Sequence, residues 1–264
     1  MVKRNSIIDI KNKKGQQKIV ALTAYSFSDA RIFDQYCDIL LVGDTVGMII
    51  YGMDNTLNVN LEMMINHSKA VVKGSKKALI IADMPFATYE KNKEFAFKNA
   101  AKLISKGGAG AVKIEYNDDL FDTVKFLVTR GIPVVGHIGL TPQHINQLGG
   151  FKHQGGDSKI ADRIVKQAKD LQDAGACMIV IEGVKEKLAS KISKKVKIPT
   201  IGIGASKDCD GQILVNYDML GIGEKIPKFA KKYANLEKNI DDAVKKYAKE
   251  VRGETFPDET HYFN

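Results

Sequence analysis

Short runs of apolar, often β-branched residues recur along the chain, and longer segments with helical spacing separate them. The runs are continuous rather than alternating, which is typical of strands buried on both faces of a parallel sheet. Seven runs cover Ile19–Thr23, Ile39–Val42, Ala78–Ala82, Ala111–Ile114, Pro133–Ile138, Met178–Ile181 and Pro199–Gly202, and Gln212–Val215 adds an eighth.

The intervening segments carry apolar residues at the three- and four-residue spacing of a helix with one buried face. The clearest of these predicted helices are Leu61–Lys73, Glu94–Ser105, Asp119–Thr129 and Asp157–Asp173. Ile240–Val251 has the same spacing but lies outside the strand–helix repeat, so it predicts an extra amphipathic helix near the C-terminus.

Alternation of strand and helix over eight units predicts an α/β protein with a (β/α)8 TIM barrel. An open, doubly wound sheet is the alternative, but no GxGxxG turn follows the first strand. Gly202-Ile203-Gly204-Ala205 comes too late and is too short to serve as that turn. Since no linker or low-complexity segment divides the chain, we expect one catalytic domain over residues 1–264.

Five consecutive predicted strands each run directly into a polar or ionisable residue. These residues are Asp44, Asp83, Glu115, His137 and Glu182. Because the carboxyl ends of parallel strands meet at one mouth of a barrel, where active sites form, we expect these side chains to lie close together.

Carboxylates held together in a half-buried place repel one another unless a cation balances their charge. Mg²⁺ suits such a site, because it takes oxygen ligands and keeps positions open for substrate and water. Zinc is disfavoured, since the chain has no HxxxH or Cys/His cluster. The alternative is that each acid caps the helix after its strand, which is common for one acid and far less so for four in succession.

Lys113 lies two residues before Glu115, so both side chains point to the same side of their strand. We favour Lys113 as the counter-charge for a substrate carboxylate, with an internal salt bridge to Asp83 or Glu115 as the alternative. His137 is a substrate-binding candidate; support of a neighbouring side chain and a purely structural role are its alternatives.

The net charge of +9 raises the question of nucleic-acid binding. Only five of the 40 basic residues are Arg, the residue that recognises phosphates and bases in a bidentate manner, so we expect no nucleic-acid partner. Three scattered cysteines, a polar N-terminus without a signal peptide and the absence of an apolar run of about 18 residues indicate a cytoplasmic protein without a membrane segment.

An ordered set of motifs resembles the ketopantoate hydroxymethyltransferase family over nearly the whole chain. The motifs are Thr23-Ala24-Tyr25, Leu41-Val42-Gly43-Asp44-Thr45-Val46-Gly47-Met48, Ile81-Ala82-Asp83-Met84-Pro85-Phe86, Val112-Lys113-Ile114-Glu115, Gly136-His137-Ile138-Gly139-Leu140-Thr141-Pro142-Gln143, Gly149-Gly150-Phe151-Lys152, Ile201-Gly202-Ile203-Gly204-Ala205, Asp210-Gly211-Gln212-Ile213-Leu214-Val215, Pro227-Lys228-Phe229-Ala230 and Phe256-Pro257.

The resemblance implies transfer of a hydroxymethyl group from 5,10-methylenetetrahydrofolate to 3-methyl-2-oxobutanoate, giving 2-dehydropantoate. This is the first step towards pantothenate, a precursor of coenzyme A. It also implies Mg²⁺ and a cytoplasmic homodecamer. Asp44, Asp83 and Glu115 match the metal-binding positions. Asp44, Thr45, Asp83 and Lys113 match those that hold the 2-oxo acid, and Glu182 matches the catalytic base.

Two segments depart from the family pattern. Thr45 replaces the usual Ser, which keeps the hydroxyl and adds a methyl group. Phe151 and His153 replace a more usual Tyr and an aliphatic residue, which bears on loop packing. A different Mg²⁺-dependent barrel enzyme that cleaves or isomerises a 2-oxo acid is the second functional hypothesis. Such enzymes commonly carry a reactive cysteine, and none lies near the strand ends before Cys177.

Overall fold

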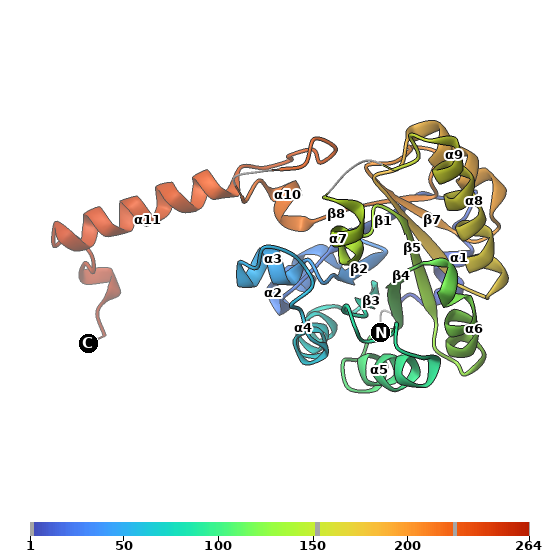
Figure 1. Cartoon of the computed structure of the whole chain (residues 1–264). Helices are drawn as coiled ribbons and strands as arrows, with labels where there is room; N and C mark the ends of the chain where they lie inside the picture. Colours follow the sequence, from blue (N-terminus) through green and yellow to red (C-terminus); the bar gives the residue numbers. More distant parts are fainter. Residues whose placement is uncertain (1–2, 151–153, 224–225, 264) are drawn as a thin grey trace. The chain divides into compact units, whose positions relative to one another are not determined.

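A computed structural model of the chain describes residues 3–150, 154–223 and 226–263 (Figure 1). The chain separates into two compact units, Met1–Leu214 and Val215–Asn264, and each is described by itself. The departures from the family pattern at Phe151 and His153 lie outside the described residues. No described helix is long and apolar enough to cross a membrane.

The first unit is a closed barrel of eight parallel strands in sequence order, and β8 pairs with β1 to complete it. The strands are β1 (Ile19–Thr23), β2 (Ile39–Val42), β3 (Leu79–Asp83), β4 (Ala111–Glu115), β5 (Val134–Gly139), β6 (Met178–Glu182), β7 (Thr200–Ile203) and β8 (Gly211–Leu214). The predicted (β/α)8 barrel is therefore confirmed, including its eighth strand.

Helices surround the strands on the outside of the barrel (Figure 1). In this unit they are α1 (Ile7–Lys11), α2 (Phe27–Phe33), α3 (Val46–Tyr51), α4 (Leu61–Gly74), α5 (Lys93–Ser105), η1 (Asp118–Leu120), α6 (Phe121–Thr129), η2 (Pro142–His144), α7 (Ile145–Leu148), α8 (Ser158–Asp173) and α9 (Glu186–Lys195). The four predicted long helices of this unit are confirmed to within about two residues, while the shorter ones and α9 were not predicted.

Five strands run one residue further than the apolar pattern predicts, and in β3, β4 and β6 the added residue is an acid. Asp83 pairs with Lys113 across β3 and β4, and Glu115 pairs with His137 across β4 and β5. Glu182 likewise pairs within the sheet, with Ile203 of β7. The acids therefore belong to the hydrogen-bonded ladder, which fixes their backbone more firmly than a loop would.

Alternate residues of each strand fill the barrel interior, as the period of two requires. The interior side chains leave a cavity of only about 10 Å³. They include Ala21, Ile39, Leu41, Ile81, Lys113, Val135, Met178, Val180, Ile201 and Ile213. Asp83, His137 and Glu182 lie two residues beyond Ile81, Val135 and Val180, so they continue the inward-facing rows to the carboxyl end of the barrel.

Outward-facing positions of the same strands pack against helices. Gly136, next to His137, shows how closely: a Cβ atom there would lie 2.3 Å from a methyl group of Leu171 on α8. Glycine at this position lets α8 approach β5, so the inward neighbour His137 is held by a tightly covered strand.

The second unit contains α10 (Asn216–Leu220), α11 (Leu236–Arg252) and η3 (Glu259–His261). The predicted C-terminal helix is confirmed and is longer than its apolar pattern. Main-chain hydrogen bonds join Tyr233 to Met219 and Glu237 to Gly221 within this unit. On α11, no described residue is buried.

Candidate active site

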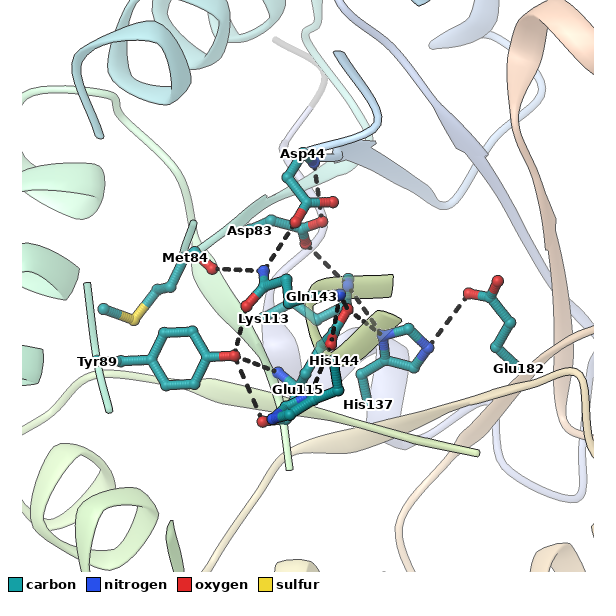
Figure 2. Close-up of polar contacts among 10 residues, drawn as sticks. All are labelled: Asp44, Asp83, Met84, Tyr89, Lys113, Glu115, His137, Gln143, His144 and Glu182. Carbon is teal, nitrogen blue, oxygen red and sulfur yellow. Dashed lines mark hydrogen bonds and ion pairs between the residues drawn. The ribbon is translucent and has the colours of Figure 1, made fainter. Parts of the chain in front are cut away.

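The carboxyl ends of β3, β4 and β5 bring four ionisable side chains together inside the barrel mouth (Figure 2). Asp83, Lys113, Glu115 and His137 are all buried, with at most 6% of each residue exposed to solvent. A charged group is almost never this deeply buried unless a partner compensates it, so the contacts of each one define what the site can do.

Asp44 follows β2 and joins this group through its main chain. Its N–H donates to Oδ2 of Asp83 at 3.0 Å. Burial raises the pKa of the Asp44 carboxyl well above its usual value, and the nearby Asp83 charge raises it further. The two carboxylates therefore form a region with too little positive charge to stabilise both in the ionised state.

Lys113 is the cation of the cluster. Its Nζ lies 3.1 Å from Oδ1 of Asp83, so the internal salt bridge considered as an alternative is present in the structure. Burial alone lowers the pKa of Lys113, but the charges of Asp83, Asp44 and Glu115 outweigh it and raise that pKa above its usual value. The ammonium group is therefore charged near neutral pH.

His137 lies between Lys113 and Glu182. Its Nδ1 lies 3.4 Å from Nζ of Lys113 and 3.8 Å from Oε1 of Glu115. Nε2 lies 3.2 Å from Oε2 of Glu182, although the pair lacks the alignment of a good hydrogen bond. The Glu182 side chain is 17% exposed, so unlike the other acids it is accessible from solvent.

The carboxylate of Glu115 is held by hydrogen bonds from two residues of η2. Both of its carboxylate oxygens accept from the main-chain N–H of Gln143, at 3.1 and 3.0 Å, and Nδ1 of His144 lies 3.1 Å from Oε2. This hydrogen bond to Glu115 raises the pKa of His144, which burial opposes.

Thr45 begins α3, and its hydroxyl lies 2.7 Å from the hydroxyl of the buried Tyr25. The alternative that the acids cap the following helices is wrong. Thr45 is the N-cap residue of α3, Asn92 that of α5, Asn117 that of η1 and Lys185 that of α9.

The donor set of this site fits a hard divalent cation. Oδ1 of Asp83 is buried and accepts no aligned hydrogen bond, although the Lys113 ammonium is close. Asp44, Asp83 and Glu115 bring three carboxylates against one lysine, and added positive charge would relieve the repulsion between them. As the side chains stand, no described group of three or more His, Cys, Asp or Glu residues is arranged to hold a metal ion.

Four contributors to the site were not singled out from the sequence: Tyr25, Tyr89, Gln143 and His144. Tyr89 donates its hydroxyl to Oε1 of Gln143 at 2.6 Å. All four lie in loops or short helices beyond the strand ends, and none is an acid, so the pattern of acids after strands does not reveal them. Gln143 follows Thr141-Pro142, and that turn sequence is the one local signal that marks its segment.

The chain is similar to proteins of one enzyme family along its whole length. The family model described as ketopantoate hydroxymethyltransferase matches residues 4–259. The 3-methyl-2-oxobutanoate hydroxymethyltransferase of Bartonella tribocorum is 53% identical over 263 residues, covering 100% of this chain and 97% of the relative. The 3-methyl-2-oxobutanoate hydroxymethyltransferase 1 of Pseudomonas aeruginosa is 50% identical, covering 98% and 96%.

Among solved structures, the barrel resembles a phosphoenolpyruvate phosphomutase from Streptomyces platensis subsp. rosaceus with a TM-score of 0.64. The two sequences are 10% identical, and the match covers 98% of this chain and 92% of the other. At this identity the likeness concerns the fold alone.

Proposed function

The chain belongs to the ketopantoate hydroxymethyltransferase family and transfers a hydroxymethyl group to 3-methyl-2-oxobutanoate, and we propose that Mg²⁺ and 5,10-methylenetetrahydrofolate serve this reaction. In this proposal Asp44, Asp83 and Glu115 hold the metal, and Glu182 is the catalytic base. The product is 2-dehydropantoate, on the route to pantothenate. The observation that supports these roles is the burial of three carboxylates with one lysine beside a separate, solvent-accessible glutamate.

The substrate is a 2-oxo acid, so the site must bind a carboxylate and a ketone side by side. Lys113 supplies the positive charge for the substrate carboxylate. Its ammonium group pairs with Asp83 in the structure, and a bound Mg²⁺ would balance the Asp83 charge and leave the ammonium group available to the substrate. The Thr45 hydroxyl, oriented by Tyr25, offers a further hydrogen bond. Mg²⁺, when bound, supplies a Lewis acid that takes up the negative charge developing on the keto oxygen.

Glu182 removes the proton from C3 of the substrate. The C–H electron pair then moves into the enolate, and C3 bonds to the one-carbon unit of the folate. Both C–N bonds of that unit break, and water supplies the hydroxyl oxygen of the product. His137, whose Nε2 lies 3.2 Å from Oε2 of Glu182, helps to place this base at the carboxyl end of the barrel.

The proposal is tested by assaying the purified protein with 3-methyl-2-oxobutanoate, 5,10-methylenetetrahydrofolate and Mg²⁺, and repeating the assay with EDTA. We expect loss of the 2-oxo acid that requires the folate, stops with EDTA and returns with excess Mg²⁺. Turnover unaffected by EDTA would count against the metal. Turnover without folate would count against the co-substrate.

The remaining features of this proposal are a cytoplasmic location, small-molecule substrates without a nucleic-acid partner, and assembly into a homo-oligomer, a decamer by family resemblance. Ile240, Val244, Tyr247 and Val251 support assembly, because they recur at helical spacing on α11 and each is at least 43% exposed. Sedimentation velocity of the purified chain, with and without these side chains replaced by Ser, tests this part.

A further inference from the structure

Gln143 hydrogen-bonds to two acids of the cluster, Asp44 and Glu115. It lies in η2, after β5, and is 4% exposed. Its Nε2 donates to Oδ2 of Asp44 at 2.7 Å and to the main-chain oxygen of Met84 at 3.0 Å. One buried amide thus connects the loops that follow β2, β3 and β5 (Figure 2).

The orientation of this amide is fixed by its neighbours. Tyr89 donates its hydroxyl to Oε1 at 2.6 Å, and the carbonyl of Met84 can only accept, so it must face the NH₂ group. A flipped amide would turn its oxygen towards the Met84 carbonyl and the Asp44 carboxylate, and would lose its hydrogen bonds to both. The NH₂ group is therefore held towards Asp44, 2.7 Å from its Oδ2.

The main chain of Gln143 acts on a second acid. Its N–H donates to both carboxylate oxygens of Glu115, and Tyr89 accepts a hydrogen bond from the main-chain N–H of Glu115 at 3.3 Å. Asp44 and Glu115 come from strands that are not adjacent in the barrel. Gln143 is the described residue that hydrogen-bonds to the carboxylates of both.

We propose that Gln143 is a positioning residue that presents the Asp44 carboxylate to the divalent cation while its main chain sets the direction of Glu115. The inference rests on the proposed metal site. A merely structural role, in which Gln143 anchors its loop, would change stability and leave cation affinity unaltered. The two roles therefore separate in a binding measurement that needs no turnover.

The experiment measures Mn²⁺ binding to the full chain by isothermal titration calorimetry, beside the thermal midpoint of each variant. Gln143→Met removes both polar atoms, keeps the side-chain length and leaves the main-chain N–H in place. We expect its Mn²⁺ affinity to fall about 10- to 100-fold, the range for residues that orient metal ligands. Affinity within about twofold of the wild type would overturn the proposal.

Gln167→Met is the matched control. Gln167 is also a buried glutamine, on α8, and it donates to Asp118 rather than to the cluster. This variant undergoes the same chemical change, so we expect Mn²⁺ affinity equal to that of the wild type. An equal loss of affinity in both variants would show that burial of methionine, and not the contact to Asp44, is responsible, and would overturn the proposal.

Tyr89→Phe keeps the proposal testable if Gln143→Met fails to fold. It removes the hydroxyl that holds Oε1 while Gln143 itself remains, so we expect a loss of affinity in the same direction but of several-fold only. The double variant should bind no more weakly than Gln143→Met alone, because both act through one amide. Unchanged affinity in Tyr89→Phe, or additive losses, would overturn the proposal.

The wild type separates this inference from the proposed function. A wild type that binds no Mn²⁺ would overturn the metal site and this inference together. A wild type that binds Mn²⁺ but transfers no hydroxymethyl group would contradict the proposed function alone, and the variants would still decide the role of Gln143.

Discussion

Two buried aspartates at opposite ends of the barrel have opposite electrostatic environments. Asp34 lies where α2 leads into β2, and its carboxylate accepts from the Ser75 hydroxyl and from the main-chain N–H groups of Lys76, Lys77 and Ala78. Burial opposes ionisation, but these donors outweigh it and lower the pKa of Asp34.

Asp44, at the carboxyl end, accepts a side-chain hydrogen bond from Gln143 and faces the Asp83 carboxylate. Its pKa moves the other way, because burial and a like charge outweigh that hydrogen bond and the Lys113 charge. Both acids are less than 9% exposed, but Asp44 lies deeper in the protein than Asp34. Their partners differ as well: four hydrogen-bond donors of the fold surround Asp34, whereas Asp44 faces a second carboxylate, which in our proposal a bound cation compensates.

Glu182→Gln is expected to have the largest effect and separates the proton-removing acid from the charge-holding ones. Loss of a general base costs about 10²- to 10⁴-fold in rate, so exchange of the C3 proton into deuterated water should fall by that factor. Mn²⁺ and 2-oxo acid binding should stay near the wild-type values. Exchange at the normal rate, followed by proton NMR, would refute the assignment.

Asp44→Asn sharpens the comparison at the carboxyl end. Removing the charge of a proposed metal ligand should weaken Mn²⁺ binding about 100-fold or more. This loss is at least as large as the one expected for Gln143→Met, which removes only a residue that orients the ligand. Since the same change relieves repulsion with Asp83, the metal-free protein should melt at an equal or higher temperature than the wild type. Calorimetry gives the affinity, and differential scanning fluorimetry in EDTA gives the melting temperature. A strongly destabilised variant would contradict this account.

Asp34→Asn makes the same chemical change at the other end and should give the opposite result. The asparagine side chain would have one acceptor oxygen instead of two, and its NH₂ group would face main-chain N–H groups that need an acceptor. We therefore expect a loss of about 2 kcal/mol in the free energy of unfolding. Mn²⁺ affinity should be unchanged. Denaturant titration measures the loss, and a neutral or stabilising effect would remove the contrast between the two ends.

The pH dependence of these two variants is expected to have opposite sign. The pKa of Asp34 is lowered on folding, so its contribution is complete above the unfolded value of about 3.9 and is lost as pH falls through the folded value. The cost of Asp34→Asn should therefore shrink in acid.

The pKa of Asp44 is raised on folding, so its penalty is absent in acid and grows as pH rises from about 3.9 to the folded value. The benefit of Asp44→Asn in EDTA should grow over the same interval. Stability curves of both variants between acidic and neutral pH measure these slopes, and parallel slopes would break the comparison.

The barrel was predictable because buried parallel strands have a strong apolar signature. The ends of the strands were harder to predict than the strands themselves. Asp83, Glu115 and Glu182 belong to the sheet, although a polar residue after an apolar run indicates the end of a strand. Helix α9 escaped prediction although it is amphipathic: three of its four buried residues, Ala189, Ser190 and Ser193, are small. The short helices have too few turns for any periodicity to develop.

For the site, the acids at the strand ends and Lys113 could be proposed from their place in the pattern, and the structure does bring them together. The orientation of Glu115 could not, because it depends on an N–H from a turn nearly thirty residues away. Gln143 has no charge and no characteristic spacing, so its hydrogen bonds to two acids become visible only in three dimensions. Assignment of roles to the acids depended on the family resemblance.

Because inward and outward residues alternate along the strands, substitutions at the two sets of positions should have different consequences. Val112, Ile114 and Gly136 face the surrounding layer, while Lys113 and His137, their immediate neighbours, face the mouth. A library that varies only the inward set would explore new substrates on an unaltered scaffold. Changing Gly136 would instead push α8 away and disturb the whole wall. Engineering this enzyme towards other 2-oxo acids should therefore vary the inward-facing strand residues and leave the outward-facing residues between them unchanged.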